Sequence, residues 1–505
     1  MEPGGPKDDV PSMKRLIYIL LPALLLGAAC ARVPQGALLT EAPARIWPDY
    51  SEIAVPCNIA PLNFRIEDEA QAYRCVARGE KGKAIVVKGR TARFPLKEWH
   101  ALLEANKGGE ISFDIYEKRD GRWYACPPVR NFVAPDPVDR YLSYRLIEPT
   151  YGMAGSMSIS QRDLSNFKEK GIFNNQLDYD RVDGQCINCH SFQNWHADRL
   201  QFHVRQKDGG TIIADHGDIR KVNLKADGFL SPGVYPSWHP SENLLAYSLN
   251  STRQYFYAKG IDKTEVIDSD SDIILYDPAT NQAQLVAADS LQLETFPYWS
   301  PDGRTLYYAS ADITQLAPMR EYYYGPHYDE LKYNLMRMDF DPATRCFGEP
   351  EVFFDAAALD LSATFPRVSP DGRYLLFTLA SFGQFHIWHR DADLYLADLV
   401  DGSLRALEEV NSDEVESYHS WSSNGRWIVF SSRRDDRTYT RLYLAWFDAE
   451  GRAHKPFLLP QRDPQQNLRL FKSYNIPEFT VDPVTLSPKQ LLKTVQGPAV
   501  QAERQ

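Results

Sequence analysis

One short pattern recurs four times in the second half of the chain, and its spacing restricts the folds that are possible. An aromatic residue stands three positions before Trp238, Trp299, Val368 and Trp421, and an apolar run begins six positions after each of them. The intervals are 61 residues (238 to 299), 69 residues (299 to 368) and 53 residues (368 to 421). Such intervals hold four strands with their loops, and four-stranded units arranged radially form a β-propeller. The pattern therefore predicts an all-β propeller.

The turn residues of the pattern support the same interpretation. Asp-Gly or Asn-Gly follows the anchor in three of the four copies, and both pairs favour the positive φ angles of a tight hairpin. The anchors read, in order, Tyr-Pro-Ser-Trp238, Phe-Pro-Tyr-Trp299-Ser-Pro-Asp-Gly, Phe-Pro-Arg-Val368-Ser-Pro-Asp-Gly and Tyr-His-Ser-Trp421-Ser-Ser-Asn-Gly. They resemble the W-S-P-D-G repeats of TolB-like propellers, a family of bacterial periplasmic proteins, over residues 234–460. The resemblance implies a propeller that usually has six blades.

We count five blades over residues 201–482, with six possible. Four contain the anchors, and Ser473–Phe479 is a degenerate fifth anchor. The strands that this fifth unit lacks are expected from residues 201–205, 210–214 and 219–224, so that the two ends of the domain pair in one blade. The polar tail, residues 483–505, is expected to be disordered.

Two segments precede the propeller. Short alternating runs over residues 49–134 predict an immunoglobulin- or fibronectin-like β-sandwich, with one helix over residues 95–106. Residues 135–200 show no sustained strand pattern. We expect them to form a short irregular or helical segment, with a helix over residues 160–170, that binds a haem.

The haem is indicated by Cys186-Ile-Asn-Cys189-His190, which spells C-x-x-C-H, the attachment signature of c-type haem. With 7 Cys and 11 His in 505 residues, chance matches number 505 × (7/505)² × (11/505), about 0.002. Cys186 and Cys189 would form the thioethers of one covalent haem c, and His190 would be the proximal iron ligand. A structural zinc would need four ligands, and a thioredoxin-like redox pair would need a βαβ context; both remain as alternatives.

The sixth iron position governs the reduction potential, because Met opposite His raises it and His opposite His lowers it. The candidates are His203, in a strand near the propeller boundary, and Met157, in a preceding loop. An open site or another His is the alternative. Five aromatic residues could supply the walls of the pocket: Phe167, Phe173, Phe192, Trp195 and Phe202.

The first thirty residues indicate export. Lys14-Arg15 precede an apolar run from Leu16 to Leu26, and small residues with Cys30 follow. This is the layout of a signal peptide over residues 1–30, with a tether over residues 31–48. The end of the signal resembles the lipobox of bacterial lipoproteins, which makes Cys30 a candidate for lipidation and membrane anchoring. Cleavage within Ala-Cys-Ala, which would remove Cys30, is the alternative.

Charge and the remaining cysteines add two expectations. A net charge of −11 and a pI near 5.6, with no basic cluster, argue against nucleic-acid binding. In an exported chain, one disulfide among Cys57, Cys75 and Cys126 is expected, with its pairing left open. Cys346 is expected to be a buried free thiol.

The combination of these features resembles a set of bacterial envelope proteins with Asn-Cys-His-Ser-Phe, here residues 188–192, and Tyr-Pro-Ser-Trp, here residues 235–238. The resemblance implies a haem protein of the periplasm or cell envelope. Our first hypothesis is electron transfer, with the propeller as the docking scaffold for a redox or envelope partner. The second is a module that binds a protein or glycan, with a structural or sensory haem. The third is a haem peroxidase-like enzyme, and we expect a carrier or binding protein rather than an enzyme.

Overall fold

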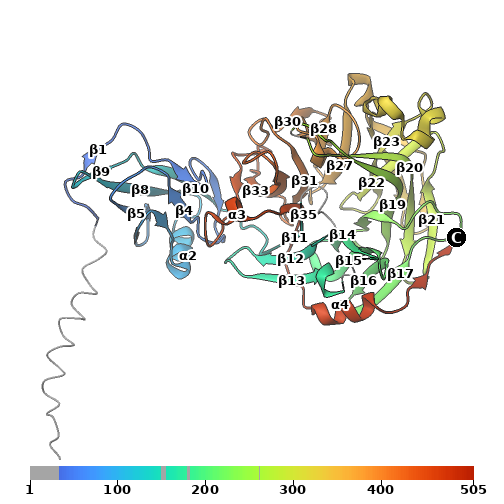
Figure 1. The fold of residues 1–505 in the computed structure, drawn as a ribbon, viewed down its shortest axis with the longest axis horizontal. Coiled ribbons are helices and arrows are strands. Elements are labelled where there is room, and N and C mark those ends of the chain that lie inside the picture. Colours follow the sequence, from blue (N-terminus) through green and yellow to red (C-terminus); the bar gives the residue numbers. More distant parts are fainter. Residues whose placement is uncertain (1–32, 149–154, 179–181, 261) are drawn as a thin grey trace, which may run out of the picture.

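The computed structural model describes residues 33–148, 155–178, 182–260 and 262–505. The expected signal peptide over residues 1–30 and the candidate lipidation site Cys30 lie outside the described residues. No helix within the described ranges is long and apolar enough to cross a membrane. The protein is all-β, with a propeller preceded by a smaller N-terminal β domain (Figure 1). The fold class predicted from the repeats is therefore confirmed.

The described part of the propeller contains five sheets, and the ten-stranded one joins two blades through a single bridge between Ser271 and Leu293. Six blades thus surround one axis, in the ring drawn in Figure 1. Each blade begins with an inner strand and continues outward. From the axis outward the strands are β35 (Ser473–Thr480), β11 (Tyr141–Ile147), β12 (Ser158–Asp163) and β13 (Glu169–Asn174) in blade 1; β14 (Gln185–Gln193), β15 (His196–Gln206), β16 (Gly210–Asp215) and β17 (Asp218–Asn223) in blade 2; β18 (Val234–Trp238), β19 (Leu245–Phe256), β20 (Thr264–Asp277) and β21 (Gln282–Ala287) in blade 3; β22 (Gln292–Trp299), β23 (Thr305–Asp312), β24 (Asn334–Asp341) and the short β25 (Cys346–Phe347) and β26 (Glu351–Phe354) in blade 4; β27 (Ser362–Val368), β28 (Tyr374–Ala380), β29 (Asp393–Asp398) and β30 (Leu404–Ala406) in blade 5; and β31 (Glu416–Trp421), β32 (Trp427–Ser432), β33 (Arg441–Trp446) and β34 (Phe457–Leu458) in blade 6.

The ring is closed in blade 1 by β35, which contains the expected degenerate anchor Ser473–Phe479, but its partner strands differ from those expected. β35 pairs antiparallel with β11, and Leu142 lies opposite Phe479. The partners expected for this strand, residues 201–205, 210–214 and 219–224, instead form the outer part of blade 2. That pairing prediction is wrong, and the number of blades is six rather than the five we counted.

The helix expected over residues 160–170 is also wrong, because this segment forms the β12–β13 hairpin. Buried polar residues in this segment interrupt the alternation of apolar and polar residues that predicts a strand. Gln161 donates a hydrogen bond from Nε2 to Thr480 Oγ1 at 2.8 Å, and Arg162 donates from Nη1 to Gln461 Oε1 at 2.6 Å. Both partners lie near the C-terminus, so these polar side chains can be buried in a strand only after the ring has closed.

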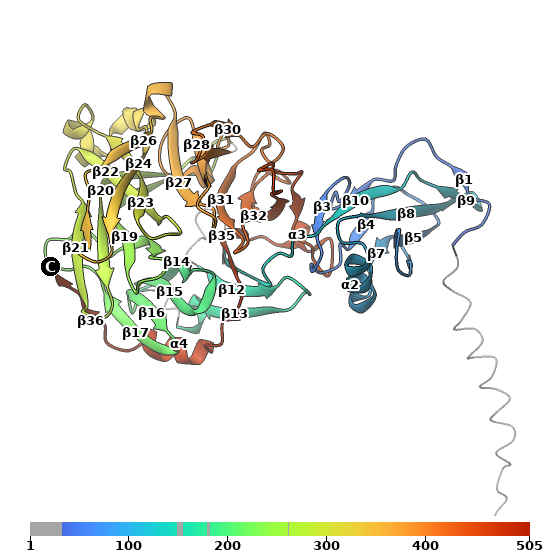
Figure 2. The same ribbon diagram turned by 180° about the vertical axis from the view of Figure 1, so that it is seen from behind.

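The C-terminal tail is ordered, contrary to expectation. It contains α4 (Pro488–Val495), whose first turn is capped by Ser487, and the short strands β36 (Val500–Gln501) and β37 (Glu503–Arg504). β36 extends blade 2 and β37 extends blade 3 by parallel pairing. Figure 2 shows α4 along the outside of blades 1 and 2. Its apolar residues Leu491 and Val495 are fully buried there, which explains why a polar segment is held in place.

The N-terminal domain consists of two sheets and one helix. The larger sheet contains β1 (Leu38–Leu39), β3 (Ala54–Pro56), β5 (Ala72–Gly79), β6 (Ile85–Lys88), β8 (Glu110–Arg119), β9 (Arg122–Ala125) and β10 (Val129–Ala134), and the smaller contains β2 (Ile46–Trp47), β4 (Phe64–Ile66) and β7 (Thr91–Ala92). The helix expected over residues 95–106 is confirmed as α2 (Leu96–Ala105). Its face of Trp99, Leu102 and Leu103 is buried, as the 3.6-residue spacing predicts.

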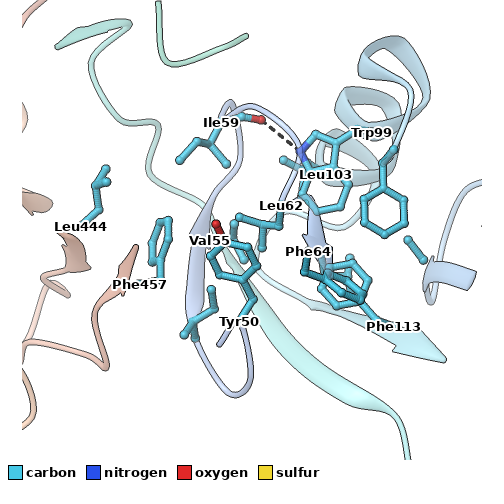
Figure 3. Close-up of a cluster of buried hydrophobic side chains, with 14 of the residues drawn as sticks. Tyr50, Val55, Ile59, Leu62, Phe64, Trp99, Leu103, Phe113, Leu444 and Phe457 are labelled. Carbon is cyan, nitrogen blue, oxygen red and sulfur yellow. Dashed lines mark hydrogen bonds between the residues drawn. The ribbon is translucent and has the colours of Figure 1, made fainter. Parts of the chain in front are cut away.

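The core of this domain continues into the propeller without a break. Figure 3 shows Tyr50, Val55 and Phe64 in the same cluster as Leu444 and Phe457 of blade 6. The same figure shows the Trp99 indole donating a hydrogen bond to the Ile59 carbonyl, at 3.1 Å. An apolar interface of this kind fixes the domain on the side of blade 6.

Phe457→Ala is expected to destabilise the protein by about 3–5 kcal/mol, since the ring is buried and contacts Tyr50 and Trp427 edge-on. Phe471→Ala is the matched control, because that ring is 71% exposed and exposed substitutions usually change stability by less than about 0.5 kcal/mol. Denaturant unfolding of both variants measures the difference. Equal stability of the two variants would contradict the continuous core.

The cysteines differ from expectation. Cys57, Cys75 and Cys126 are all free thiols in the described structure, as is Cys346. Cys346 is exposed rather than buried, because it lies in β25 at the outer edge of blade 4. The disulfide expected among the first three is therefore not formed.

Candidate functional site

The inner strands of the six blades share one backbone feature. In each, a residue other than Gly has a positive φ, between 48° and 54°, at a point where the pairing with the neighbouring strand shifts register. Such bulges redirect a side chain, and a positive φ is uncommon for residues with a Cβ. The six residues are Cys189, Tyr235, Phe296, Phe365, Tyr418 and Ile476. The second cysteine of the C-x-x-C-H motif therefore occupies the position that aromatic residues hold in four other blades.

Aromatic rings from these positions block the propeller axis. The ring centroids of Tyr235 and Phe296 are 4.4 Å apart, those of Phe296 and Phe365 are 4.1 Å apart, and those of Phe365 and Tyr418 are 5.1 Å apart. Phe385, from the loop between β28 and β29, contacts Tyr235, Phe365 and Tyr418 at 6.1–6.5 Å. The channel is therefore filled at this level.

A cavity of about 140 Å³ lies on one side of this aromatic plug. Its floor is formed by the six positive-φ residues, and its wall by the residues that follow them in each inner strand. Asn194, Pro240 and Pro301, which lie in or next to the short turns that follow the inner strands, line its outer part. Phe385 is not part of the lining, so it closes the channel from the opposite side.

The C-x-x-C-H motif lies on β14, the inner strand of blade 2, and two of its three functional residues reach this cavity. Cys189 and His190 are lining residues, whereas Cys186 is not. The side chain of Asn188 lies between the two thiols: its Nδ2 donates to Cys186 Sγ at 3.2 Å, and its Oδ1 accepts from Cys189 Sγ at 3.1 Å. Both thiols are free. The Asn188 side chain contacts each of them and holds both beside the same part of the strand.

His190 is buried without a hydrogen-bond partner. It is 2% exposed, and neither ring nitrogen makes a hydrogen bond of acceptable geometry. Burial lowers the pKa of His190 to about 3, and the nearby Arg145 lowers it further, while the Ile476 backbone opposes the shift. The imidazole is therefore neutral at physiological pH, the form that ligates a metal. Unpaired buried polar atoms are costly, so this site is suited to a ligand that would satisfy a ring nitrogen.

The other residues predicted from the sequence lie outside the cavity lining. His203 is buried in β15, opposite Asn188 in the strand register, and its Nδ1 is 2.7 Å from Thr211 Oγ1. Met157 is buried in the core between blades 1 and 2. Of the five aromatic residues, Phe192 and Trp195 line the cavity, Phe173 and Phe202 stack in the blade 1–2 core, and Phe167 contacts two arginines.

The sequence reasoning missed the residues two positions after each positive-φ residue. They are Ser191, Ser237, Tyr298, Arg367, Ser420 and Glu478, one from each blade, and all line the cavity. The signal that could have found them is an alignment of Cys189-His-Ser-Phe192 with Tyr418-His-Ser-Trp421. That alignment identifies the C-x-x-C-H segment as the sixth anchor.

Two ionisable side chains of this set face the cavity without pairing. Burial raises the pKa of Glu478 to about 8, although the Phe192 N–H donates a hydrogen bond to its Oε1 at 3.1 Å. Burial lowers the pKa of Arg367, whose guanidinium lies over the Tyr298 ring at 4.6 Å. Glu478 is therefore largely neutral and Arg367 charged at neutral pH, which leaves the cavity positive.

No group of three or more His, Cys, Asp or Glu residues that could hold a metal ion occurs in the described ranges. A structural zinc of the kind weighed from the sequence needs four protein ligands. The thiols and His190 therefore fit one axial ligand and two covalent attachment points better than a closed tetrahedral site.

Comparison with known proteins shows distant likeness only. No protein-family model and no curated protein sequence matches the chain. A crystal structure of TolB from Acinetobacter baumannii is similar at 14% identity, over 74% of this chain and 79% of that chain, with a TM-score of 0.40. The β-propeller domain of the Trilobed protease from Pyrococcus furiosus is similar at 13% identity, over 71% of this chain and 96% of that chain, with a TM-score of 0.32. The propeller is established here by its own strand pairing.

Proposed function

We propose that this protein is an exported c-type cytochrome-like protein that carries one covalent haem near the propeller axis. The observation that carries the proposal is the pair of buried His190 ring nitrogens, which lack partners and lie on the same strand as two free thiols. Cys186 and Cys189 would hold the haem through thioethers, and His190 would ligate its iron. When bound, the haem would supply one-electron chemistry.

The residues around the motif have separate roles in this proposal. Asn188 orients both thiols, because its amide contacts each of them. Burial keeps His190 neutral, so a ring nitrogen retains the lone pair that ligation requires. Gln201 donates a hydrogen bond from Nε2 to the Cys189 carbonyl. This bond fixes the bulged backbone at Cys189, directly before His190.

For the sixth position we propose His203 rather than Met157. His203 Nδ1 is hydrogen-bonded to Thr211, the arrangement that orients a ligating imidazole through its other nitrogen. Burial lowers the pKa of His203 to about 3, so this ring is also neutral. His203→Ala is expected to convert a low-spin haem into a high-spin one, as read by optical and electron paramagnetic resonance spectra. Met157→Leu, the control, should leave the spectrum unchanged.

Electron transfer is the role we propose, with the propeller as the docking scaffold for a redox or envelope partner. The location would be the periplasm or cell envelope, with an N-terminal lipid anchor if Cys30 is acylated. A single haem cycles one electron, and the motif lies near a cavity lined partly by residues of the turns between strands. A binding module is the second candidate, favoured by the unpaired Arg367 in that cavity.

Intact-mass analysis tests the haem directly. Mature protein made in a host with the c-type attachment machinery should carry about 616 Da beyond its polypeptide mass. A low-spin spectrum with reversible reduction then supports electron transfer, whereas a high-spin iron that binds added ligands would support the peroxidase-like alternative. A polypeptide mass without the addition would falsify the cytochrome proposal and leave the binding module.

A further inference from the structure

Arg367 is a half-buried cation that lines the axial cavity without an ion-pair partner among the described residues. Its Nη1 donates a hydrogen bond to the Pro366 carbonyl at 2.8 Å, and its guanidinium lies over the Tyr298 ring. No described carboxylate oxygen lies within 4.0 Å of it, the limit for an ion pair. Some partly buried arginines of the propeller are ion-paired, as Arg390 is with Glu414 at 2.7 Å and Arg434 with Glu416 at 2.8 Å, whereas Arg433, over the Trp388 ring, is not ion-paired with any described residue. Arg367 differs from Arg433 in lining the axial cavity.

The Glu478 carboxyl group lines the same cavity but forms no ion pair with Arg367. Glu478 belongs to blade 1, whereas Arg367 belongs to blade 5, and blade 6 lies between them. The Glu478 carboxyl accepts a hydrogen bond from the Phe192 N–H and interacts electrostatically with Arg367 without forming an ion pair with it. A half-buried guanidinium without an ion-pair partner gains from pairing with an anion, and no carboxylate of the described residues forms that ion pair.

The other polar groups of the cavity restrict the kind of ligand that can bind there. Ser420 Oγ donates to the Pro477 carbonyl at 2.8 Å, and Ser237 Oγ accepts from the Trp299 N–H at 3.3 Å. The wall is otherwise largely aromatic, with Trp195 and Tyr298 among the lining residues. In another protein, a cavity of about 150 Å³ accommodates benzene, so about 140 Å³ is enough for a body of that size.

We infer that the axial cavity binds a carboxylate group and that Arg367 is the residue that pairs with it. A guanidinium presents two parallel N–H donors that match a carboxylate, and the aromatic wall accommodates a planar apolar body. The carboxylate has two possible sources, which share this chemistry. One is a free organic acid of about the size of benzoate, and the other is a propionate group of the haem, the second source resting on the proposed function.

The first arm uses protein without haem, the Cys186→Ser/Cys189→Ser variant, and benzoate as the probe in calorimetric titration. Benzoate should bind, and benzamide, which has the same ring and no charge, should bind at least about tenfold more weakly. Arg367→Met should weaken benzoate binding by at least about tenfold. Arg367→Lys keeps the charge but not the two parallel N–H donors, and should weaken benzoate binding less. Arg337→Met is the control, since that arginine is paired with Glu351 on the surface.

The second arm uses the haem-loaded protein, once its mass shows attachment. If a propionate fills the site, benzoate should bind to the haem-free variant and not to the loaded protein, and Arg367→Met should shift the reduction potential while Arg337→Met does not. If benzoate binds both forms, the source is a free acid. Equal binding of benzoate and benzamide to haem-free protein, or no benzoate binding there, overturns the inference, whether or not the mass test finds a haem.

Discussion

Replacing Cys186 and Cys189 together by Ser is expected to prevent attachment of the proposed covalent haem completely. Each thioether requires one thiolate sulfur, and neither thiol is engaged in a disulfide. The intact mass of the double variant should equal that of the polypeptide, about 616 Da below the loaded protein. Each single variant should retain one bond and attach haem incompletely.

Cys346→Ser is the matched control for this experiment, because it removes an exposed thiol on the outer edge of blade 4. It should leave haem content unchanged. The variants at the motif should keep the circular dichroism of the wild type, since the thiols contribute only weak hydrogen bonds to Asn188. Stoichiometric covalent haem in the double variant would show that the attachment site lies elsewhere.

Tyr474→Ala combined with Phe479→Ala is expected to unfold the propeller at room temperature. Both side chains lie on the closing strand β35 and are buried, at 3% and 0% exposure. The Tyr474 ring contacts Tyr144 edge-on, at 5.0 Å, and its backbone joins blade 1 to blade 6, because Thr440 and Ser431 both donate hydrogen bonds to the Tyr474 carbonyl. Truncation of one such aromatic costs about 3–5 kcal/mol, and the sum approaches the entire stability of about 5–15 kcal/mol of a typical domain.

Leu468→Ala combined with Phe471→Ala is the control for the closing strand. These side chains precede β35 directly and are 56% and 71% exposed, so their loss should change stability by less than about 1 kcal/mol in total. Thermal and denaturant unfolding of the two double variants measures the contrast. A propeller that remains cooperative and near wild-type stability without Tyr474 and Phe479 would show that the ring does not depend on closure in blade 1.

The candidate site could be predicted only in part. C-x-x-C-H identifies three residues by their chemistry, and the free thiols and unpaired imidazole are compatible with it. Arg367 could not be selected, because in sequence it is one variable position within an anchor. What distinguishes it is its place in the lining of the axial cavity, a property of six strands brought together from distant parts of the chain.

The spacing of Trp238, Trp299, Val368 and Trp421, with the Gly residues of the turns, was enough to establish strands, hairpins and a radial architecture, because these follow from local periodicity and turn geometry. The closing strand was recognised in this way, as the degenerate anchor Ser473–Phe479, but its partner was not. β11 and β35 are separated by more than three hundred residues, and polar residues such as Gln161 are buried in strands only through that long-range pairing. The same closure brings Cys189 and His190 to the axis beside Glu478 and Arg367. No local rule decides which inner strands face one another across the cavity, so the sequence alone could not predict this arrangement.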